Sequence, residues 1–362
     1  MIFSKTNASR WTLPITDASA IGATLSTLSK TARRSVEVLS GHTWTVVPHG
    51  ISSVSALGPR RGKRFDTILQ DEVRGVVPIR GIFHQQDSPK KRLVILLHGI
   101  ASSPKAGYIR TMARTLFSAG HDVLRLALRG ALSTGSDHYH AGQTEDLHAV
   151  LADPRIARYD EIFIIGYSLG GQIATRFSLL TDDPRLRGVA AICAPISMKS
   201  SQVALDARAM APYRYAILWE LKQKYRRLAR EGERVGRPMK TSIDAVNAVR
   251  TFYQWDETVV CPRYGFASVE DYYDTVSVGP QLKELKIPAL FIFSEFDPLV
   301  PYDPLRPYLK DLNPTTHVKV LNQGGHLGFS SNLQLGYGRR TGLCQQVTAW
   351  MNLVGRETST SR

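Results

Sequence analysis

The chain has 362 residues, of which 43% are hydrophobic and 21% are charged, and its formal net charge is +15. This composition is typical of a globular protein and excludes extensive disorder, and no apolar run reaches the roughly 18 residues of a membrane-spanning helix. The 46 basic residues outnumber the 31 acidic ones, but the basic stretches carry neither a nucleic-acid-binding motif nor interleaved aromatic residues, so we expect no nucleic-acid partner.

The cysteines and the N-terminal residues indicate in which cell compartment the protein is expected. Cys193, Cys261 and Cys344 have no metal-ligand spacing, so we expect buried thiols in a reducing compartment, with neither a metal nor an organic cofactor. The N-terminus lacks the charged start and apolar stretch of a secretory signal. A cytoplasmic location is the expectation, and organelle targeting is the alternative left by a Ser/Thr-rich, acid-poor start.

In chain order, residues 1–42 carry little strand signal. We expect a separate N-terminal extension that is helical, from the apolar spacing of "ASAIGATLSTLSKTARRSVEVLS", or partly disordered. Two short strands are expected next, at residues 43–47 and 75–83, separated by the basic loop 58–64.

A regular alternation of strands and helices follows. Strand-length apolar runs lie at 92–99, 122–128, 161–166, 188–194, 289–293 and 317–321, and helical patterns lie at 108–120, 142–152, 170–180 and 342–354. Buried strands that alternate with helices predict an α/β fold with a mostly parallel central sheet and helices on both faces.

One interval, residues 196–285, interrupts this alternation. It is first helical, basic and aromatic, and then becomes rich in loop signals over residues 251–277. We expect a cap or lid inserted over the carboxyl edge of the sheet, where open α/β folds bind their ligands. The α/β core would then comprise residues 43–195 and 286–355.

The stretch "IIGYSLGGQI" places Ser168 in a G-x-S-x-G motif between a predicted strand and a predicted helix. In that setting the serine occupies a tight, strained turn, and only glycines fit two positions before and after it. The sequence therefore predicts Ser168 as a nucleophile. The alternative is a glycine-rich turn with a serine that caps the helix.

A serine nucleophile needs a histidine base and an acid that orients the histidine. Asp297 follows the predicted strand 289–293, and His326 follows the strand 317–321 in the glycine-rich stretch "NQGGHLGF". The order serine, acid, histidine is that of G-x-S-x-G hydrolases. Glu295 is a second candidate acid, and we prefer Asp297 because the stretch "DPLVP" has loop character.

An oxyanion hole is expected from two backbone N–H groups, those of Ile100 and Leu169. Ile100 follows the strand that ends in His98 and Gly99, and Leu169 follows the nucleophile. Such donors stabilise the tetrahedral intermediate. We expect His98 to orient this loop rather than to act as a base.

Most of residues 92–330 resembles one group of α/β-hydrolases, which includes bacterial YheT-type hydrolases, yeast medium-chain ethyl ester synthase/esterases and mammalian membrane-bound phospholipases and lipases. The likeness lies in "LHGIASSPKAGYIRTMARTL", "LALRGA", "YHAGQTEDLHAVL", "GYSLGG", "FYQWDETVVCPRYGFASVEDYYDTVS", "IPALFIFSEFDPLVP" and "GGHLGF".

The resemblance implies Ser168 as nucleophile, Asp297 as orienting acid and His326 as base. It assigns Arg129, Gly130, residues 144–146 and the block "GFASVEDYY" to the framework of the fold. The usual pair of aspartates before proline reads Phe296 and Asp297 here, and residues 1–42 contain no span like the anchor of the mammalian relatives.

The function expected is hydrolysis of a small-molecule or lipid-like carboxylic ester with a short- to medium-chain acyl group. Acyl transfer to an alcohol, thioester or peptide hydrolysis, and a catalytically silent binding scaffold are the alternatives. The run "YRYAILW" at 213–219 would form an acyl pocket or simply core. The basic stretch 221–240 would be a solvated face or a peripheral contact with anionic membrane.

Overall fold

The computed structural model of the chain describes residues 39–43, 45, 62–72, 75–132, 135 and 137–360, the last four for their backbone only. Most of the N-terminal extension expected over residues 1–42 lies outside these residues. Its described part, residues 39–42, is helical, and so are residues 43 and 45 just after it.

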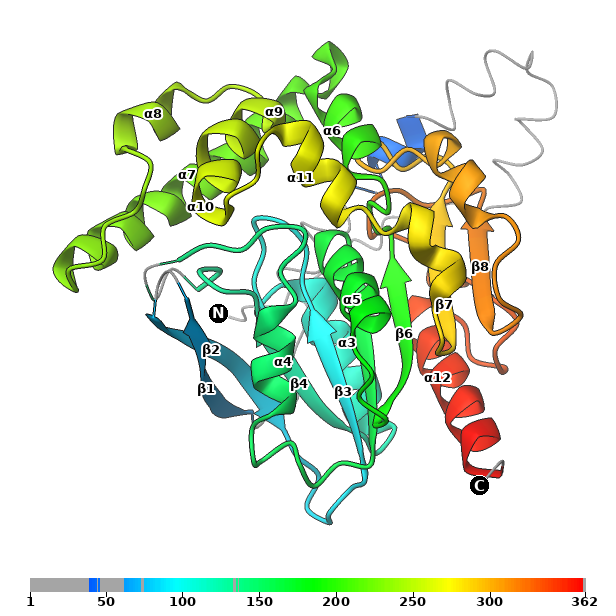
Figure 1. Ribbon diagram of the computed structural model, residues 1–362. Helices are drawn as coiled ribbons and strands as arrows, with labels where there is room; N and C mark the ends of the chain where they lie inside the picture. Colours follow the sequence, from blue (N-terminus) through cyan, green and yellow to red (C-terminus); the bar gives the residue numbers. More distant parts are fainter. Residues whose placement is uncertain are drawn as a thin grey trace, which may run out of the picture.

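An eight-stranded sheet forms the centre of the molecule, with strand order β1-β2-β4-β3-β5-β6-β7-β8 (Figure 1). Strand β2 runs antiparallel to both β1 and β4, and all pairs from β4 to β8 are parallel. The mostly parallel sheet predicted from the apolar runs is therefore confirmed. The strands span Lys63–Asp71 (β1), Gly75–His84 (β2), Arg92–Leu97 (β3), Asp122–Ala127 (β4), Glu161–Tyr167 (β5), Leu186–Ile192 (β6), Ala289–Ser294 (β7) and Thr316–Leu321 (β8).

The prediction for the first strand was wrong. Residues 43 and 45 of the expected strand 43–47 are helical, and the strand that pairs with β2 is β1, which begins inside the expected loop 58–64. Strand β1 lies at the edge of the sheet, and of its side chains only Phe65 is fully buried. An edge strand with one buried residue lacks the apolar pattern on which the sequence prediction depends.

Helices cover both faces of the sheet, as the alternation predicted. On one face lie α3 (Gly107–Ser118) and α12 (Leu343–Thr360), and on the other lie α4 (Glu145–Leu151) and α5 (Leu169–Leu180). Each helix buries a stripe at three- and four-residue spacing, such as Val347, Trp350, Met351 and Val354 of α12.

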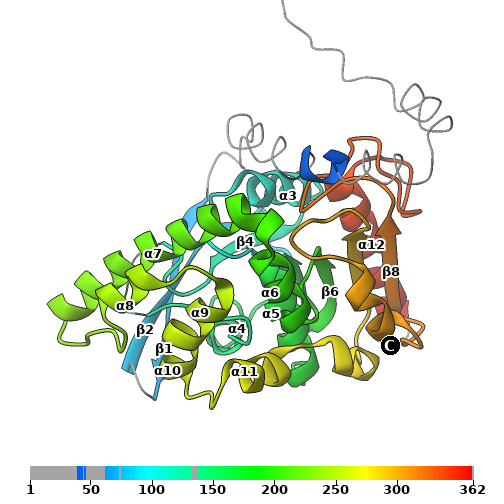
Figure 2. The same cartoon turned by 90° about the horizontal axis from the view of Figure 1, so that it is seen from above.

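The segment between β6 and β7, which we call the cap, contains helices and no strand over residues 196–285, all of which are described. Figures 1 and 2 show these helices across the end of the sheet toward which β6 points. They span Met198–Asp206 (α6), Ala211–Arg234 (α7), Ile243–Ala248 (α8), Phe252–Trp255 (α9), Cys261–Tyr264 (α10) and Val269–Val276 (α11).

The second half of the cap is more helical than its loop signals suggested. Thr251 and Ser268 act as N-caps whose side chains accept the N–H groups of Gln254 and Asp271, and Gly265 ends α10 with a φ of 78°. These residues begin and end very short helices. A π-helical turn, residues 256–260, joins α9 to α10.

A buried ionic network joins the cap to the sheet. Arg129, just beyond β4, pairs with Asp146 at 2.6 Å and with Asp71 and Asp137 at 2.9 Å. Arg263 of α10 pairs with Asp137 at 2.7 Å and with Asp71 at 3.3 Å. Burial disfavours the charge on Arg129, yet the surrounding carboxylates raise its pKa. The two arginines therefore share acids from the core and hold α10 against it.

Candidate active site

Ser168 occupies a strained turn between β5 and α5, with φ 51° and ψ −125°. Positive φ is uncommon for a residue with a side chain and costs of order 1–3 kcal/mol. A side chain at Gly166 would overlap the backbone of Gly170, and one at Gly170 would overlap carbonyl oxygens at the end of β3. Both glycines are needed for the turn to lie this close to the sheet.

His326 lies between Ser168 and Asp297 and contacts both. Its Nε2 is 3.0 Å from the Ser168 hydroxyl, and its Nδ1 is 2.9 Å from one Asp297 oxygen and 3.2 Å from the other. All three side chains are buried. Because a carboxylate only accepts hydrogen bonds, Nδ1 carries the proton and Nε2 is left to accept from the serine hydroxyl.

The loop after β7 fixes the orientation of Asp297. The backbone N–H groups of Leu299 and Val300 donate to Asp297 Oδ1 at 2.9 and 3.0 Å, which turns Oδ2 toward His326. The alternative acid, Glu295, is exposed. The structure thus brings Asp297 into contact with the histidine, as expected of the preferred acid.

A residue that the sequence did not indicate, Thr45, holds the backbone of His326. The His326 N–H donates to Thr45 Oγ1 at 2.8 Å, and this hydroxyl donates to the carbonyl of Gly41 at 2.8 Å. A side chain at Gly325 would overlap the Gly41 carbonyl. The helical residues 39–43 and 45 therefore pack directly against the loop that carries the histidine. No sequence signal connects residues so far apart.

The loop after β3 carries Ile100 and lies beside Ser168, since a Cβ at Gly99 would be 3.1 Å from the Ser168 Cβ. The N–H of Gly99 donates to the Tyr108 hydroxyl at 3.0 Å, and that of Ala101 donates to the Tyr139 hydroxyl at 2.8 Å. The N–H groups of Ile100 and Leu169 donate to no acceptor in the described part of the chain. They are therefore available to a ligand beside the serine.

His98 has the surroundings of a structural residue. Its Nδ1–H donates to the Gly99 carbonyl at 2.8 Å, and its Nε2 accepts the N–H of Leu128 at 3.2 Å. Burial lowers the pKa of His98 to about 3, so the ring is neutral and both nitrogens are engaged. It orients the loop that carries Ile100.

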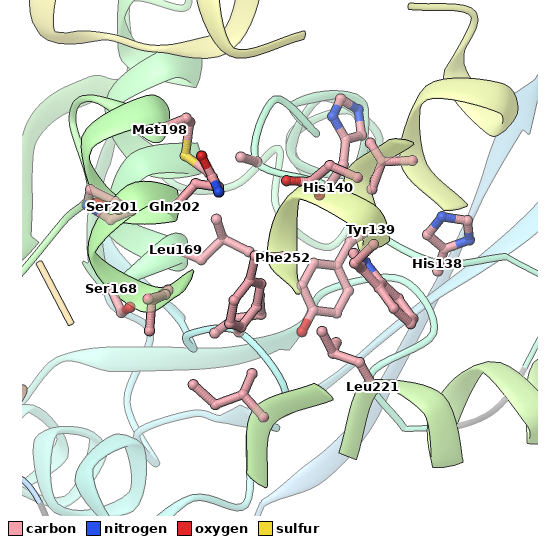
Figure 3. A pocket seen from close by; sticks show the side chains of 18 of the residues that line it. His138, Tyr139, His140, Ser168, Leu169, Met198, Ser201, Gln202, Leu221 and Phe252 are labelled. Atoms are coloured by element: carbon pink, nitrogen blue, oxygen red, sulfur yellow. The ribbon is translucent and has the colours of Figure 1, made fainter. Parts of the chain in front are cut away.

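A pocket leads from Ser168 beneath the cap (Figure 3). Its lining is mostly apolar, with Leu169, Met198, Leu221 and Phe252 among the side chains that face it. Residues 213–219 were expected to form either an acyl pocket or core, and the structure distributes them among the pocket, the core and the surface. Ile217 lines the pocket and Leu218 is core, whereas Tyr215 and Trp219 are 73% and 49% exposed.

The pocket lining also contains ionisable side chains, among them Arg129, His138, His140 and Asp256. In Figure 3 His138 lies on the opposite side of the pocket from Ser168. Burial holds the pKa of His140 well below its ordinary value. Burial, with a smaller effect from the charge of Asp206, raises the pKa of Asp256 to about 7.

Among the described residues, one trio of potential metal ligands lies close together, namely Cys193, Asp297 and His326. Burial and the nearby Asp297 raise the pKa of Cys193 well above its ordinary value, so this sulfur is a thiol rather than the thiolate that binds metals. Asp297 and His326 are already engaged with each other. The donor set suits proton transfer better than metal binding.

A family model described as the alpha/beta hydrolase fold matches residues 92–333, a range that contains Ser168, Asp297 and His326. The chain belongs to the α/β-hydrolase family. The match covers about two thirds of the sequence and includes the whole cap.

This α/β-hydrolase is similar to YheT of Escherichia coli, with 24% identity over 67% of the chain and 72% of YheT. It is 23% identical to the monoacylglycerol lipase of Saccharomyces cerevisiae over 74% of the chain and 62% of that protein. Among solved structures, the Pyrococcus furiosus esterase Pf2001 matches with a TM-score of 0.47 and 18% identity over 74% of this chain and 84% of that one. The family match and the two curated relatives confirm the resemblance to the YheT-type group. Of the helices in the described ranges, none combines the length and apolarity needed to cross a membrane.

Proposed function

We propose that this α/β-hydrolase cleaves carboxylic esters through an acyl-enzyme on Ser168. The observation that carries the proposal is the position of His326, which contacts the serine hydroxyl and the Asp297 carboxylate at 3.0 and 2.9 Å. A strained serine, a base within hydrogen-bond reach and an acid that orients the base form the constellation that activates a hydroxyl for acyl transfer.

In the acylation step, Ser168 Oγ attacks the ester carbonyl while its proton passes to His326 Nε2. The carbonyl oxygen becomes an oxyanion, which accepts hydrogen bonds from the N–H groups of Ile100 and Leu169. His326 then gives the proton to the leaving alcohol as the C–O bond breaks. Asp297 stabilises the histidine while it is charged.

In the deacylation step, His326 takes a proton from water, and the resulting hydroxide attacks the acyl-enzyme. The tetrahedral intermediate uses the same two backbone donors. It collapses as His326 returns the proton to Ser168, which releases the carboxylic acid. An alcohol in place of water would give a new ester, and acyl transfer is therefore the alternative outcome at this site.

The pocket supports an ester with a hydrophobic acyl group. An alkyl chain in this pocket would contact Leu169, Leu221 and Phe252. Removing each of its methylene groups from water would add about 0.8 kcal/mol to the binding free energy. The yeast relative carries the name monoacylglycerol lipase, which also favours a lipid-like ester.

Fluorophosphonate labelling of the wild type and of Ser168→Ala tests the nucleophile. We expect the wild type to be labelled and the variant to remain unlabelled. Turnover of p-nitrophenyl esters from acetyl to palmitoyl then tests the substrate class, and we expect the highest kcat/KM beyond acetyl.

Three results would contradict the proposal. Labelling that persists in Ser168→Ala would remove this serine from the role. Labelling without turnover of any ester would favour thioester or amide substrates. A wild type that is neither labelled nor active would favour a binding scaffold.

A further inference from the structure

Lys224 of the cap contacts the loop that carries Ile100. Its Nζ donates to the carbonyl oxygens of Ala101 at 2.7 Å and of Ser102 at 2.8 Å. The side chain also lines the pocket that leads to Ser168. Lys224 lies in the basic stretch 221–240, for which the sequence suggested a solvated face or a membrane contact, yet it is turned inward.

The carbonyls that Lys224 binds belong to a tight turn. The N–H of Ser102 donates to the Gly99 carbonyl at 3.3 Å, and Ala101 has a φ of 55°, which is strained for a residue with a side chain. The N–H groups of Gly99 and Ala101 are held by two tyrosines of the core. The core thus holds the N–H side of the turn, and the cap holds the carbonyl side.

We propose that Lys224 is a positioning residue that fixes the Ile100 N–H toward the oxyanion and thereby completes the oxyanion hole only when the cap is seated on the core. The proposal rests on the proposed function of Ser168. A charged donor makes hydrogen bonds about twice as strong as a neutral one, and a donor misplaced by about 1 Å costs up to about 100-fold in rate.

The charge of the Lys224 side chain is expected to change near pH 8. Burial lowers the pKa of Lys224 to about 8. On its own helix, Glu220 opposes this effect and Arg227 adds to it. On the facing side lie His98, which is neutral, and the Tyr139 hydroxyl, whose pKa is raised. The lysine therefore loses its proton as the pH rises through about 8.

The chain offers a matched control on the same helix. Lys222 Nζ also donates to two backbone carbonyls, those of Asn247 at 3.1 Å and Val249 at 2.6 Å, but both belong to the cap. Lys222→Met therefore removes the same kind of interaction without touching the loop of Ile100.

The first experiment compares ester turnover by Lys224→Met, Lys224→Arg and Lys222→Met. We expect Lys224→Met to lower kcat by about 10- to 100-fold with little change in KM, Lys224→Arg to recover most of it, and Lys222→Met to match the wild type. In the wild type kcat should fall above about pH 8, and Lys224→Arg should move this fall to higher pH because arginine stays charged. An unchanged kcat in Lys224→Met, or an equal loss in Lys222→Met, would overturn the proposal.

The second experiment does not require turnover. Hydrogen exchange of the amides at 99–102, followed by mass spectrometry, should be faster in Lys224→Met than in Lys222→Met. If the wild type hydrolyses no ester but this difference is found, the proposed function fails and the positioning role stands. Equal exchange in the two variants would overturn the positioning role.

Discussion

The sheet core and the cap are held in place by different interactions. In the core, β3 is a continuous apolar run whose residues from Leu93 to Leu97 have no solvent exposure. The cap contacts the core through polar groups as well, since Arg263 pairs with Asp137 and Lys224 binds two loop carbonyls. Apolar burial is not directional, whereas ion pairs and hydrogen bonds specify one geometry.

This difference indicates that the core and the cap contribute different parts of the proposed site. The core supplies Ser168, Asp297 and His326 from three strand ends, where all three side chains are buried and joined by hydrogen bonds. The cap supplies the pocket and the outer contact to the oxyanion loop. Substitutions in the core trio should therefore abolish chemistry without loosening the cap, and substitutions at the polar joins should loosen the cap first.

The largest effect is expected from Asp297→Asn. The amide keeps the size of the side chain but presents an N–H₂ group to His326, which favours the wrong tautomer and lowers kcat by about 10⁴-fold. Steady-state ester turnover measures this change. Glu295→Gln is the control, and an equal loss there would show that the acid is misassigned.

Next comes Arg263→Met, which breaks the join between α10 and the core. Because Asp137 is buried and would lose a charged partner, we expect a loss of about 3–5 kcal/mol in the free energy of unfolding. Urea denaturation measures the loss, and limited proteolysis should cut first within residues 196–285. Arg234→Met, which breaks an exposed pair with Glu231, should leave both unchanged; first cuts in the core would contradict the comparison.

A smaller effect, dependent on pH, is expected from Asp256→Asn in the cap. The pKa of Asp256 is raised to about 7, so the folded state binds more protons than the unfolded state between about pH 4 and pH 7, and wild-type stability falls as the pH rises through this range. Asparagine does not titrate, so the stability of the variant does not fall in this way. At about 1.4 kcal/mol per pH unit, the free energy of unfolding of the variant should exceed that of the wild type by an amount that grows with pH to at most about 4 kcal/mol at pH 8.

Thermal and urea unfolding at pH 4, 6 and 8 measure this gain. The Tyr273 hydroxyl, 2.7 Å from Asp256 Oδ2, can donate equally to an asparagine oxygen, which makes the substitution conservative. A difference between variant and wild type that does not change with pH would contradict the assignment.

The smallest effect is expected from Thr45→Val. Valine keeps the shape of threonine but leaves the buried His326 N–H without its acceptor, at a cost of about 1–3 kcal/mol, and we expect kcat to fall about tenfold as the loop shifts. Thr43→Val is the control, because the hydroxyl of Thr43 is exposed and, among the described residues, donates to the Leu39 carbonyl of the same segment rather than to the histidine loop. Equal kinetics in the two variants would sink this prediction.

Strands β2 to β8 and the positions of Ser168, Asp297 and His326 after strand ends were predictable because their signals are local. A parallel strand covered on both faces is an apolar run, and Ser168, Asp297 and His326 each follow such a run. The glycines around Ser168 reflect backbone contacts within a few residues. For these features, a short window of sequence contains the physical cause.

The rest depends on contacts between distant residues. Lys224 and Ala101 are 123 positions apart, and no local pattern connects them, so the sequence around Lys224 does not show that its side chain turns inward. Strand β1 was missed because its pairing with β2, rather than its own burial, makes it a strand. The short helices α9 and α11 begin at the single N-caps Thr251 and Ser268, and α10 ends at Gly265, so these helices are too short to show a long apolar stripe in the sequence.

The separation of the site residues along the chain has a consequence for biosynthesis. His326 lies 158 positions after Ser168, and its backbone is held by Thr45, 281 positions earlier. A nascent chain that has already placed Ser168, the proposed nucleophile, in the growing sheet still lacks His326, the proposed base. Because His326 follows the whole cap in the sequence, the proposed hydrolytic competence can arise only after residues 196–285 have been synthesised.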